Sequence, residues 1–480
     1  MHQQHQETPT TTTKTMNPVL ISGAGLSSLL LARALRAANI PIRIYERDAS
    51  VSFRGQGYRL RLSDEGLDAI ESVLKSPGSQ PDAWDEFWAA CGQTGGAGFA
   101  TIDALTGEQV KQSTSESLHS RDGKIIGIAR GDMRRIFMRG LEDDIEWNRH
   151  VTGYELNNNN NDNTATAVHA LFADGTRSPP GSMLIGGEGI HSLVAKQLSG
   201  GRLKVYDSGA RGIHGQAPTG AFKGLGEGVF RIVETAAQPP SSSSDAAAAA
   251  GNGTATATAT TTAATATTTA AAATTATATT TAATATTTNR LSIITNVRSR
   301  DMHDPSLSFG WTMIAPPGVI TTPDSSSSPA SSTDRNNVSS SSTIGHPAAR
   351  LAKQLTQNWH PRVRSLIDEM DDSEAAFWKI TCSNAAQFRG VPVWPNDPRV
   401  TVIGDAVHSM TPAGGLGANT AVRDAALLGK LIADRGGFAE GITEAYEKEM
   451  RVYGSAMVAK SYALARAQFG IDIREDSPTI

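Results

Sequence analysis

Apolar and polar positions near the start of the chain follow the order strand, turn, helix, strand. Residues 17–22 form a short apolar segment that predicts a buried strand, and a glycine-rich turn at 23–28 follows it directly. Leucine and alanine then recur at helical spacing over 29–35, which predicts a helix with one apolar face. A second apolar segment at 42–45 predicts the next strand and ends at Glu46. This order is typical of a dinucleotide-binding βαβ unit.

The turn and the acidic residue have roles that follow from nucleotide chemistry. Gly23 allows the tight turn, and Gly25 lets a pyrophosphate approach the backbone at the helix N-terminus. The third position of the glycine pattern holds Ser28, which is still small enough for close packing of helix on strand. Glu46 is placed to accept hydrogen bonds from a ribose. We therefore predict a dinucleotide site, an ordinary βα turn being the alternative.

Three later segments place polar residues where a predicted strand or helix begins or ends. Arg130 lies at the start of an amphipathic helix, although a solvated arginine is the alternative interpretation. A buried strand beginning at Met183 stops at Glu188, which lies between two glycines. Another, at 400–403, leads to Asp405, whose carboxylate could hold a hydroxylated chain. Strand ends of this kind are where open α/β sheets bind ligands.

A glycine-rich loop follows Asp405 and leads into a further predicted helix. Its glycines let backbone N–H groups converge on an acceptor, and the positive end of the helix beginning near Ala418 adds to this effect. A simple NAD-binding domain has no use for such a loop. Its candidate residues are Pro412, Gly415, Gly417, Ala418 and Asn419.

Four segments cannot contribute to a packed core, because they are rich in Thr, Asn, Ala and Ser. They cover 1–16, 157–164, 236–289 and 321–345. Without large apolar side chains they cannot offset the roughly 1–2 kcal/mol per residue that ordering the backbone costs. We predict disordered surface loops and a disordered tail, the alternative for the Ala/Thr block being a helix. The rest of the chain has an ordinary globular composition.

Charge and cysteine content exclude several other classes of protein. The net charge of −4 gives no long-range attraction for nucleic acid or an anionic membrane. Cys91 and Cys382 have no metal-ligand spacing, so we expect buried structural thiols and no metal site. The tail lacks the features of a signal or transit peptide, and no apolar stretch reaches the roughly 18 residues that span a bilayer. We expect a soluble, cytoplasmic protein in a reducing compartment.

Several segments share their pattern with one known family of enzymes. They read GAGLSS, YERD, GIARGDMRRIF, MLIGGEGIHS and GDAVHSMTPAGGLGANTAVRDAALL, with RGQGYRLRLSDEGLDAI at 54–70, VYDSGARGIHGQ at 205–216 and EAYEKEMRVYG at 444–454. The set resembles the single-component FAD-dependent monooxygenases, the aromatic hydroxylases of the para-hydroxybenzoate hydroxylase type. The main departure is Glu188, where the family usually has Asp, and it could alter FAD affinity or the docking of NAD(P)H.

The resemblance implies an α/β fold with two interleaved domains. A Rossmann-like FAD-binding domain is built from discontinuous segments, a β-sheet domain binds the substrate, and a helical tail closes the chain. The FAD-binding domain would comprise 17–75, 125–200 and 390–435, the substrate domain 76–124 and 201–389 with the insertions at 236–289 and 321–345, and the helical region 436–480.

The resemblance also implies which residues hold the cofactor. The adenosine ribose would bind Glu46, and Asp405 would meet the ribityl chain or the pyrophosphate. The loop from Pro412 to Asn419 would line the flavin ring. Arg211 falls where relatives carry an active-site arginine that meets the substrate, and it is the one catalytic candidate. The cofactor set is Gly23, Gly25, Ser28, Glu46, Arg47, Gly57, Arg130, Asp405, Pro412, Gly415, Gly417, Ala418 and Asn419.

The implied reaction uses FAD with NAD(P)H as co-substrate. NAD(P)H reduces the flavin, O₂ adds at its C4a position, and the hydroperoxide transfers oxygen to a small hydrophobic substrate, aromatic or polycyclic, which is hydroxylated or epoxidised. Two alternatives stay open: another flavin reaction on this fold, such as halogenation or dehydrogenation, and a flavoprotein-like binding module without redox chemistry. We expect a monomer or homodimer.

Histidines and aromatic residues within the motifs have structural interpretations as well. His191 and His408 lie near strand ends, where hydrogen-bonding histidines are commoner than catalytic ones, and no catalytic base is identifiable. Aromatic residues on strands are core by default, with a role in lining a substrate pocket as the alternative. Those assigned to the presumed substrate sheet are Trp311, Phe377, Trp378 and Trp394.

Overall fold

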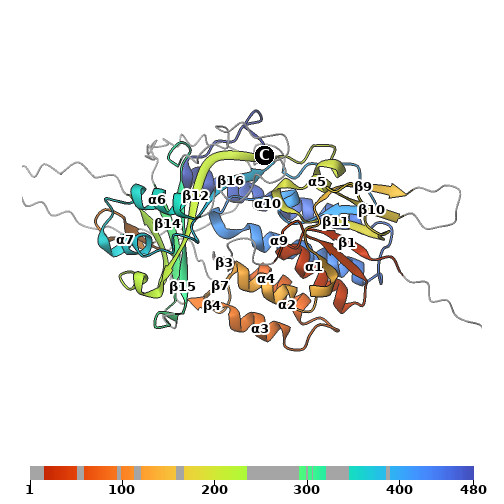
Figure 1. The fold of residues 1–480 in the computed structure, drawn as a ribbon, viewed down its shortest axis with the longest axis horizontal. Coiled ribbons are helices and arrows are strands. Elements are labelled where there is room, and N and C mark those ends of the chain that lie inside the picture. Colours follow the sequence, from red (N-terminus) through yellow and green to blue (C-terminus); the bar gives the residue numbers. More distant parts are fainter. Residues whose placement is uncertain are drawn as a thin grey trace, which may run out of the picture. The chain divides into compact units, whose positions relative to one another are not determined.

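The N-terminal βαβ unit forms the centre of a five-stranded parallel sheet in the computed structural model (Figure 1). The strand order is β17 (Val400–Val402), β11 (Met183–Gly186), β1 (Val19–Ser22), β2 (Ile42–Tyr45) and β8 (Ile145–Glu146), and all four pairings are parallel. The structure describes residues 16–50, 59–94, 99–112, 120–157, 167–234, 291–298, 301–304, 306–320, 345–384 and 390–480. Nearly all of the low-complexity segments, and the predicted site residue Gly57, lie outside these ranges.

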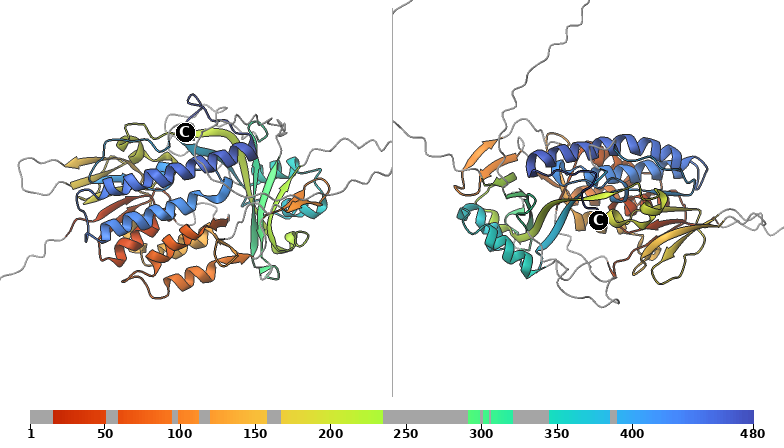
Figure 2. Two further views of the ribbon diagram at one scale, coloured as in Figure 1. Left: turned by 180° about the vertical axis from the view of Figure 1, so that it is seen from behind. Right: turned by 90° about the horizontal axis from the view of Figure 1, so that it is seen from above.

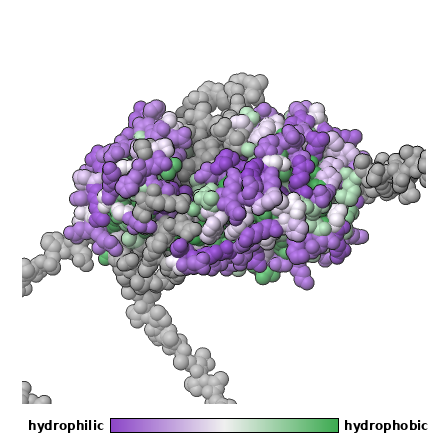
Figure 3. All heavy atoms as spheres, turned by 90° about the horizontal axis from the view of Figure 1, so that it is seen from below, coloured by the Kyte–Doolittle hydropathy of each residue, from purple (hydrophilic) through white to green (hydrophobic). Residues whose placement is uncertain are grey.

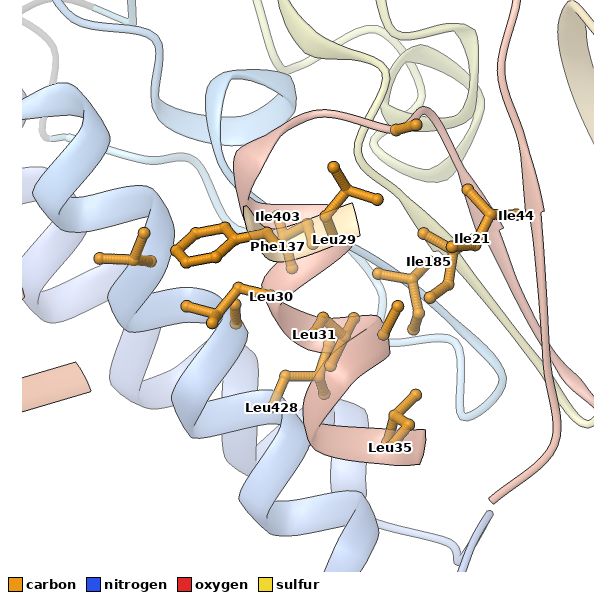
Figure 4. Packing of buried hydrophobic residues seen from close by; sticks show 14 of the residues in the cluster. Ile21, Leu29, Leu30, Leu31, Leu35, Ile44, Phe137, Ile185, Ile403 and Leu428 are labelled. Atoms are coloured by element: carbon orange, nitrogen blue, oxygen red, sulfur yellow. The ribbon is translucent and has the colours of Figure 1, made fainter. Parts of the chain in front are cut away.

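Three helices pack together beside this sheet, namely α1 (Leu26–Ala37), α4 (Arg130–Met138) and α9 (Gly417–Ala433). The leucines that predicted the apolar face of α1 are fully buried. Figure 4 shows them between strand residues such as Ile21 and Ile185 and residues such as Leu428 of α9. Gly429 lets the two helices approach closely, because a Cβ there would lie 2.7 Å from the Cβ of Ala34.

A second, seven-stranded sheet forms the other large part of the fold. Its order is β16 (Ala376–Ser383), β12 (Val205–Pro218), β15 (Ser308–Ala315), β14 (Ser292–Val297), β13 (Gly228–Val233), β5 (Phe99–Asp103) and β6 (Gln109–Gln112). Only the pairing of β13 with β5 is parallel. Buried residues of this sheet, such as Ile213 and Met313, share a core cluster with α6 (His346–Leu355) and α7 (Pro361–Asp368). Trp311 belongs to that core and donates from Nε1 to the carbonyl of Leu366 at 2.9 Å.

Smaller elements complete the described part of the chain. A three-stranded sheet has the order β3 (Arg59–Leu62), β7 (Ile125–Ala129), β4 (Gly92–Thr94), and β9 (Val151–Asn157) pairs with β10 (Ala167–Phe172). The remaining α-helices are α2 (Asp64–Leu74), α3 (Ala83–Ala90), α5 (Leu193–Leu198), α8 (Asp405–His408) and α10 (Ile442–Phe469). Short 3₁₀ helices occupy Glu142–Asp144, Gly189–His191, Thr219–Phe222 and Ala413–Gly415.

The long helix α10 connects the regions of the two large sheets. It runs alongside α9 (Figure 2) and also contacts β16 and β17. Its residues Val458 and Tyr462 share a third core cluster with Ile314 of β15 and Ala413. The predicted fold class is therefore confirmed: a Rossmann-like sheet of discontinuous segments, a β-sheet part and a C-terminal helical region. The limits of the two domains stay a prediction.

The environment of the cysteines and the properties of the surface can also be compared with the expectations from the sequence. Cys91 and Cys382 are free and buried, as expected, and burial raises the pKa of each thiol to about 12. Hydrophilic residues cover most of the face seen in Figure 3. Among the described residues, no helix combines the length and apolarity needed to cross a membrane. The same residues contain no cluster of three His, Cys, Asp or Glu side chains arranged for a metal ion.

Candidate cofactor site

The polar strand ends predicted from the sequence meet at one edge of the parallel sheet. The chain continues in register past β1 and β11, since Gly187 N–H donates to the carbonyl of Ser22 at 2.8 Å. Past β17, Ile403 N–H donates to the carbonyl of Gly186 at 2.9 Å. The glycine turn, Glu188 and Asp405 thus follow neighbouring strands, because parallel strands place their carboxyl ends together.

The two glycines of the first turn are required for different reasons. Gly23 has φ +90°, and a Cβ on it would lie 2.7 Å from the carbonyl oxygen of Gly187. Gly25 has φ −78°, and the nearest atom to a Cβ on it would be the same oxygen at 3.8 Å. Packing within the protein therefore requires glycine at position 23 but not at position 25. A bare backbone at Gly25 fits a ligand that approaches the N-terminus of α1, which has no side-chain cap and no acidic residue in its first turn.

Glu46 is fixed beside this turn by backbone donors. Its two carboxylate oxygens accept from Ala24 N–H at 2.7 Å and from Asp48 N–H at 2.9 Å, and the residue is 7% exposed. Arg134 lies 3.9 Å from Glu46 and donates to the carbonyl of Ala24 at 3.0 Å. Arg134 was not among the residues predicted from the sequence, where its signal is an arginine at a buried position of an amphipathic helix.

Ser28 has a packing role in the structure. It is fully buried, and a Cβ built on Gly187 would lie 2.2 Å from its Oγ. The small residues at 28 and 187 therefore let α1 lie close to the turn that follows β11, as the sequence predicted for the third position of the pattern. Direct contact of Ser28 with a cofactor stays a prediction.

Arg130 and Asp405 lie near each other, although their segments are far apart in the sequence. Asp405 is exposed, while Ala406 and Val407 after it are buried. Neighbouring protein atoms reduce the solvation of the Asp405 carboxylate and so raise its pKa. The charge of Asp424 adds to the rise, and the charges of His408 and Arg130 oppose it. Gly404 has φ +62°, and a Cβ on it would meet Ser27 Oγ at 2.8 Å, so this glycine brings Asp405 close to the start of α1. Arg47 is partly exposed and lowers the pKa of His150 after the larger effect of burial.

Asn419 connects the glycine loop after α8 to the end of β3. The side chain accepts from Ser63 N–H at 2.8 Å and donates to the carbonyls of Arg61 and Gly415 at 3.0 and 2.8 Å. These bonds tie the loop to β3, while the backbone of Gly415 has φ +63°. The partly exposed residues left on the loop are Pro412, Gly414, Gly415, Leu416, Gly417 and Ala418. They precede or begin α9, whose N-terminus has no side-chain cap.

Arg211 makes its described side-chain hydrogen bonds within its own strand, β12. Its guanidinium makes two hydrogen bonds to Asp207, at 2.7 and 3.0 Å, and a third to the carbonyl of Ala210. Its neighbour across the sheet is Ala315, which belongs to the core cluster with α6 and α7. The catalytic role of Arg211 stays a prediction that no described contact supports.

The other face of the second sheet carries a polar and aromatic group of His214, Thr312 and Trp378, of which only Trp378 was named from the sequence, as a core residue or, alternatively, a pocket-lining one. His214 Nδ1 lies 2.9 Å from Thr312 Oγ1, and its ring stacks on Trp378 at 4.8 Å. Burial lowers the pKa of His214 to about 4. Trp378 packs against the core cluster that includes Ala413, so this face borders the glycine loop. The alternating pattern of the segment 205–216 could have singled out His214.

Glu188 lies next to the first turn, and a Cβ on Gly23 would be 2.9 Å from its Cα. Its Oε1 accepts from Val194 N–H at 3.1 Å, and its Oε2 is buried without a hydrogen-bond partner. Burial raises the pKa of this carboxyl.

Comparison with known proteins gives matches along nearly the whole chain. Residues 266–461 match the FAD binding domain family. Dual O-methyltransferase/FAD-dependent monooxygenases of Phaeosphaeria nodorum and Cercospora beticola are 29% and 26% identical to this chain, over 94% of it and 46% of each relative. The chain thus spans about half the length of these curated relatives.

Solved structures show the same fold. Klebsiella pneumoniae HpxO in complex with FAD and uric acid has a TM-score of 0.60 and 18% identity, covering 95% of this chain and 90% of that one. The 2,6-dihydroxypyridine-3-hydroxylase of Arthrobacter nicotinovorans has a TM-score of 0.61 and 15% identity, covering 97% and 96%. At such identities the likeness concerns the arrangement of the elements.

Proposed function

We propose that the chain is an FAD-dependent monooxygenase, which binds FAD and transfers one oxygen atom from O₂ to a small organic substrate. The observation that carries the proposal is the convergence of the bare Gly25 backbone, the fixed Glu46 carboxylate and the exposed Asp405 at one sheet edge. An anion-binding helix N-terminus between two carboxylates matches a dinucleotide, whose phosphates lie between hydroxylated chains.

Each part of this edge has a task toward the cofactor. Glu46 would accept from the adenosine ribose, the N-terminus of α1 would hold the pyrophosphate, and Asp405 would accept from the ribityl hydroxyls. Arg130 adds a positive charge near Asp405. The loop from Pro412 to Asn419, with the N-terminus of α9 behind it, would face the flavin ring and stabilise negative charge there through backbone N–H groups.

When bound, FAD accepts a hydride from NAD(P)H and activates O₂, which the side chains of this protein cannot do. The protein supplies the binding groups and a surface for the substrate. The face with His214, Thr312 and Trp378 offers an aromatic ring and hydrogen-bonding atoms beside the loop at Ala413. With a pKa near 4, His214 is neutral at neutral pH and can orient a phenolic or carbonyl oxygen. We therefore propose an aromatic or polycyclic substrate.

Only one of the two activities in the names of the curated relatives is proposed for this chain. Residues 266–461 match the FAD binding domain family, and the cofactor candidates proposed here are those of a dinucleotide site. The limits of the domains given by the resemblance are part of the proposal. So is residence in the cytoplasm, as a monomer or homodimer.

The visible spectrum of the purified protein, followed by turnover assays, tests the proposal. A yellow protein, or one that turns yellow on addition of FAD, is expected, with NADH or NADPH oxidation and O₂ uptake stimulated by phenols or polycyclic aromatic compounds. Mass spectrometry should find a product heavier by one oxygen atom, labelled when ¹⁸O₂ is supplied. A protein that binds no FAD refutes the proposal, and flavin reduction that yields only hydrogen peroxide with every substrate refutes the monooxygenase part of it.

A further inference from the structure

A buried carboxylate on α9 ties together three segments next to Asp405. Asp424 is fully buried, and its Oδ2 accepts from Gly404 N–H at 2.7 Å and lies 2.7 Å from His408 Nε2. Its Oδ1 accepts from the hydroxyl of Tyr453 at 2.6 Å. Asp424 thus contacts the residue before Asp405, the last residue of α8, and the C-terminal helix α10.

The segment that carries Asp405 has few hydrogen bonds of its own. Helix α8 has four residues, and its internal bonds to the carbonyl of Gly404 come only from Val407 and His408, both at 3.0 Å. Gly404 itself has φ +62°, a conformation that the local sequence does not enforce. A helix this short is marginal without outside support, and Asp424 supplies bonds to both of its ends.

Charge strengthens this connection. Burial is the largest single effect and lowers the pKa of the His408 imidazole, but the charge and hydrogen bond of Asp424, the charge of Asp405 and a backbone hydrogen bond together raise it above the ordinary value. A buried carboxylate without such donors would be strongly unfavourable, and with them its bonds are charge-assisted and directional. The residues around Asp424 are therefore fixed relative to one another.

We propose that Asp424 is a positioning residue of the FAD site, which acts by holding the Gly404–His408 segment so that Asp405 faces the cofactor. Tyr453 extends this support to α10, so that the C-terminal helix takes part in FAD binding without touching the cofactor. The inference rests on the proposed binding of FAD. Neither Asp424 nor Tyr453 was predicted as a site residue, and His408 takes on a supporting role beyond structural hydrogen bonding.

Equilibrium binding of FAD to the apo-protein tests the proposal, with unfolding of the apo-protein measured in parallel. Tyr453→Phe removes one hydroxyl from the network. Tyr462→Phe is the matched control, because Tyr462 lies buried on the same helix but its hydroxyl accepts from Ile473 N–H at 3.0 Å. We expect the FAD dissociation constant to rise roughly tenfold in Tyr453→Phe, and less than about twofold in the control, at a similar loss of apo-protein thermal stability in both.

Graded substitutions at Asp424 give a second measurement. Asp424→Asn keeps an acceptor for Gly404 N–H and should weaken FAD binding less than Asp424→Ala, which leaves three buried donors without a partner. If Asp424→Ala does not fold, the Tyr453 and Tyr462 pair decides. Unchanged FAD affinity in Tyr453→Phe and Asp424→Asn would overturn the inference, as would an equal loss in Tyr462→Phe. Failure of the unaltered protein to bind FAD would instead refute the proposed function.

Discussion

Replacing Gly25 by alanine separates cofactor binding from protein stability. The backbone at Gly25, φ −78° and ψ 176°, is open to any residue, and the added methyl group would meet only the carbonyl of Gly187 at 3.8 Å, an ordinary contact. Alanine is a poorer helix N-cap than glycine but reduces the freedom of the unfolded chain, so we expect the free energy of unfolding to change by less than about 1 kcal/mol. The methyl group would instead occupy the surface proposed for the pyrophosphate.

Replacing Gly23 is the matched control, because it should do the reverse. Alanine there must adopt φ +90°, and its Cβ would lie 2.7 Å from the carbonyl oxygen of Gly187 and 2.9 Å from the Cα of Glu188. The left-handed backbone alone costs about 1–2 kcal/mol, and the shift of two backbone segments adds to that. We therefore expect Gly23→Ala to lower the free energy of unfolding by at least about 2 kcal/mol.

Urea unfolding of both apo-proteins, with FAD titration monitored by flavin fluorescence, distinguishes the two effects. Gly25→Ala should unfold at the urea concentration of the unaltered protein, while its FAD dissociation constant rises by roughly tenfold or more. Wild-type FAD affinity in Gly25→Ala would refute the placement of the pyrophosphate. A large loss of stability in that variant would refute the inference that packing within the protein does not require glycine at position 25.

Three further outcomes are expected. Asp405→Ala should leave purification without bound flavin, because it removes the carboxylate proposed for the ribityl chain, and full flavin occupancy in that variant would contradict the assignment. The imidazole of His214, whose pKa burial lowers from 6.5 to about 4, stays uncharged in the folded state and contributes stability above pH 6.5 that is lost as the pH falls toward 4. Between pH 6.5 and pH 4, the free energy of unfolding should therefore fall by about 3 kcal/mol more in the unaltered protein than in His214→Gln. Parallel curves of unfolding free energy against pH for the two proteins would contradict this expectation. Cys91 and Cys382, with pKa values of about 12, should not react with Ellman's reagent at pH 8 in the folded protein, whereas both should react in urea.

Local pattern accounts for most of the elements around the site. The predicted strand that begins at Ile42 forms β2 and ends at Tyr45, one residue before Glu46, and the helix expected near Ala418 begins at Gly417. The leucines of α1 are buried as their spacing predicted. These features depend on periodicity and on glycine turns, which act over a few residues and can be read directly from the chain.

Contacts between distant segments were harder to predict. Arg211 was chosen by its position in a motif, and in the structure it forms an ion pair with Asp207 and lies opposite Ala315, a member of the core cluster with α6 and α7, so its catalytic role stays a prediction. His214, three residues later, lies on the face that borders the glycine loop. Strand alternation could separate the two residues, but which face meets the loop depends on how the second sheet packs.

The sequence by itself determined the dinucleotide turn, the acid after the second strand and the glycine loop, because each is a short run of residues whose chemistry is local. Only the tertiary structure decided that Gly23 is required by the protein and Gly25 is not, since that difference depends on Gly187 and Glu188 lying across the turn. It alone decided that Asp424 and Tyr453 support Asp405, because a buried hydrogen-bond network joins side chains by proximity in space and leaves no periodic signal in the chain.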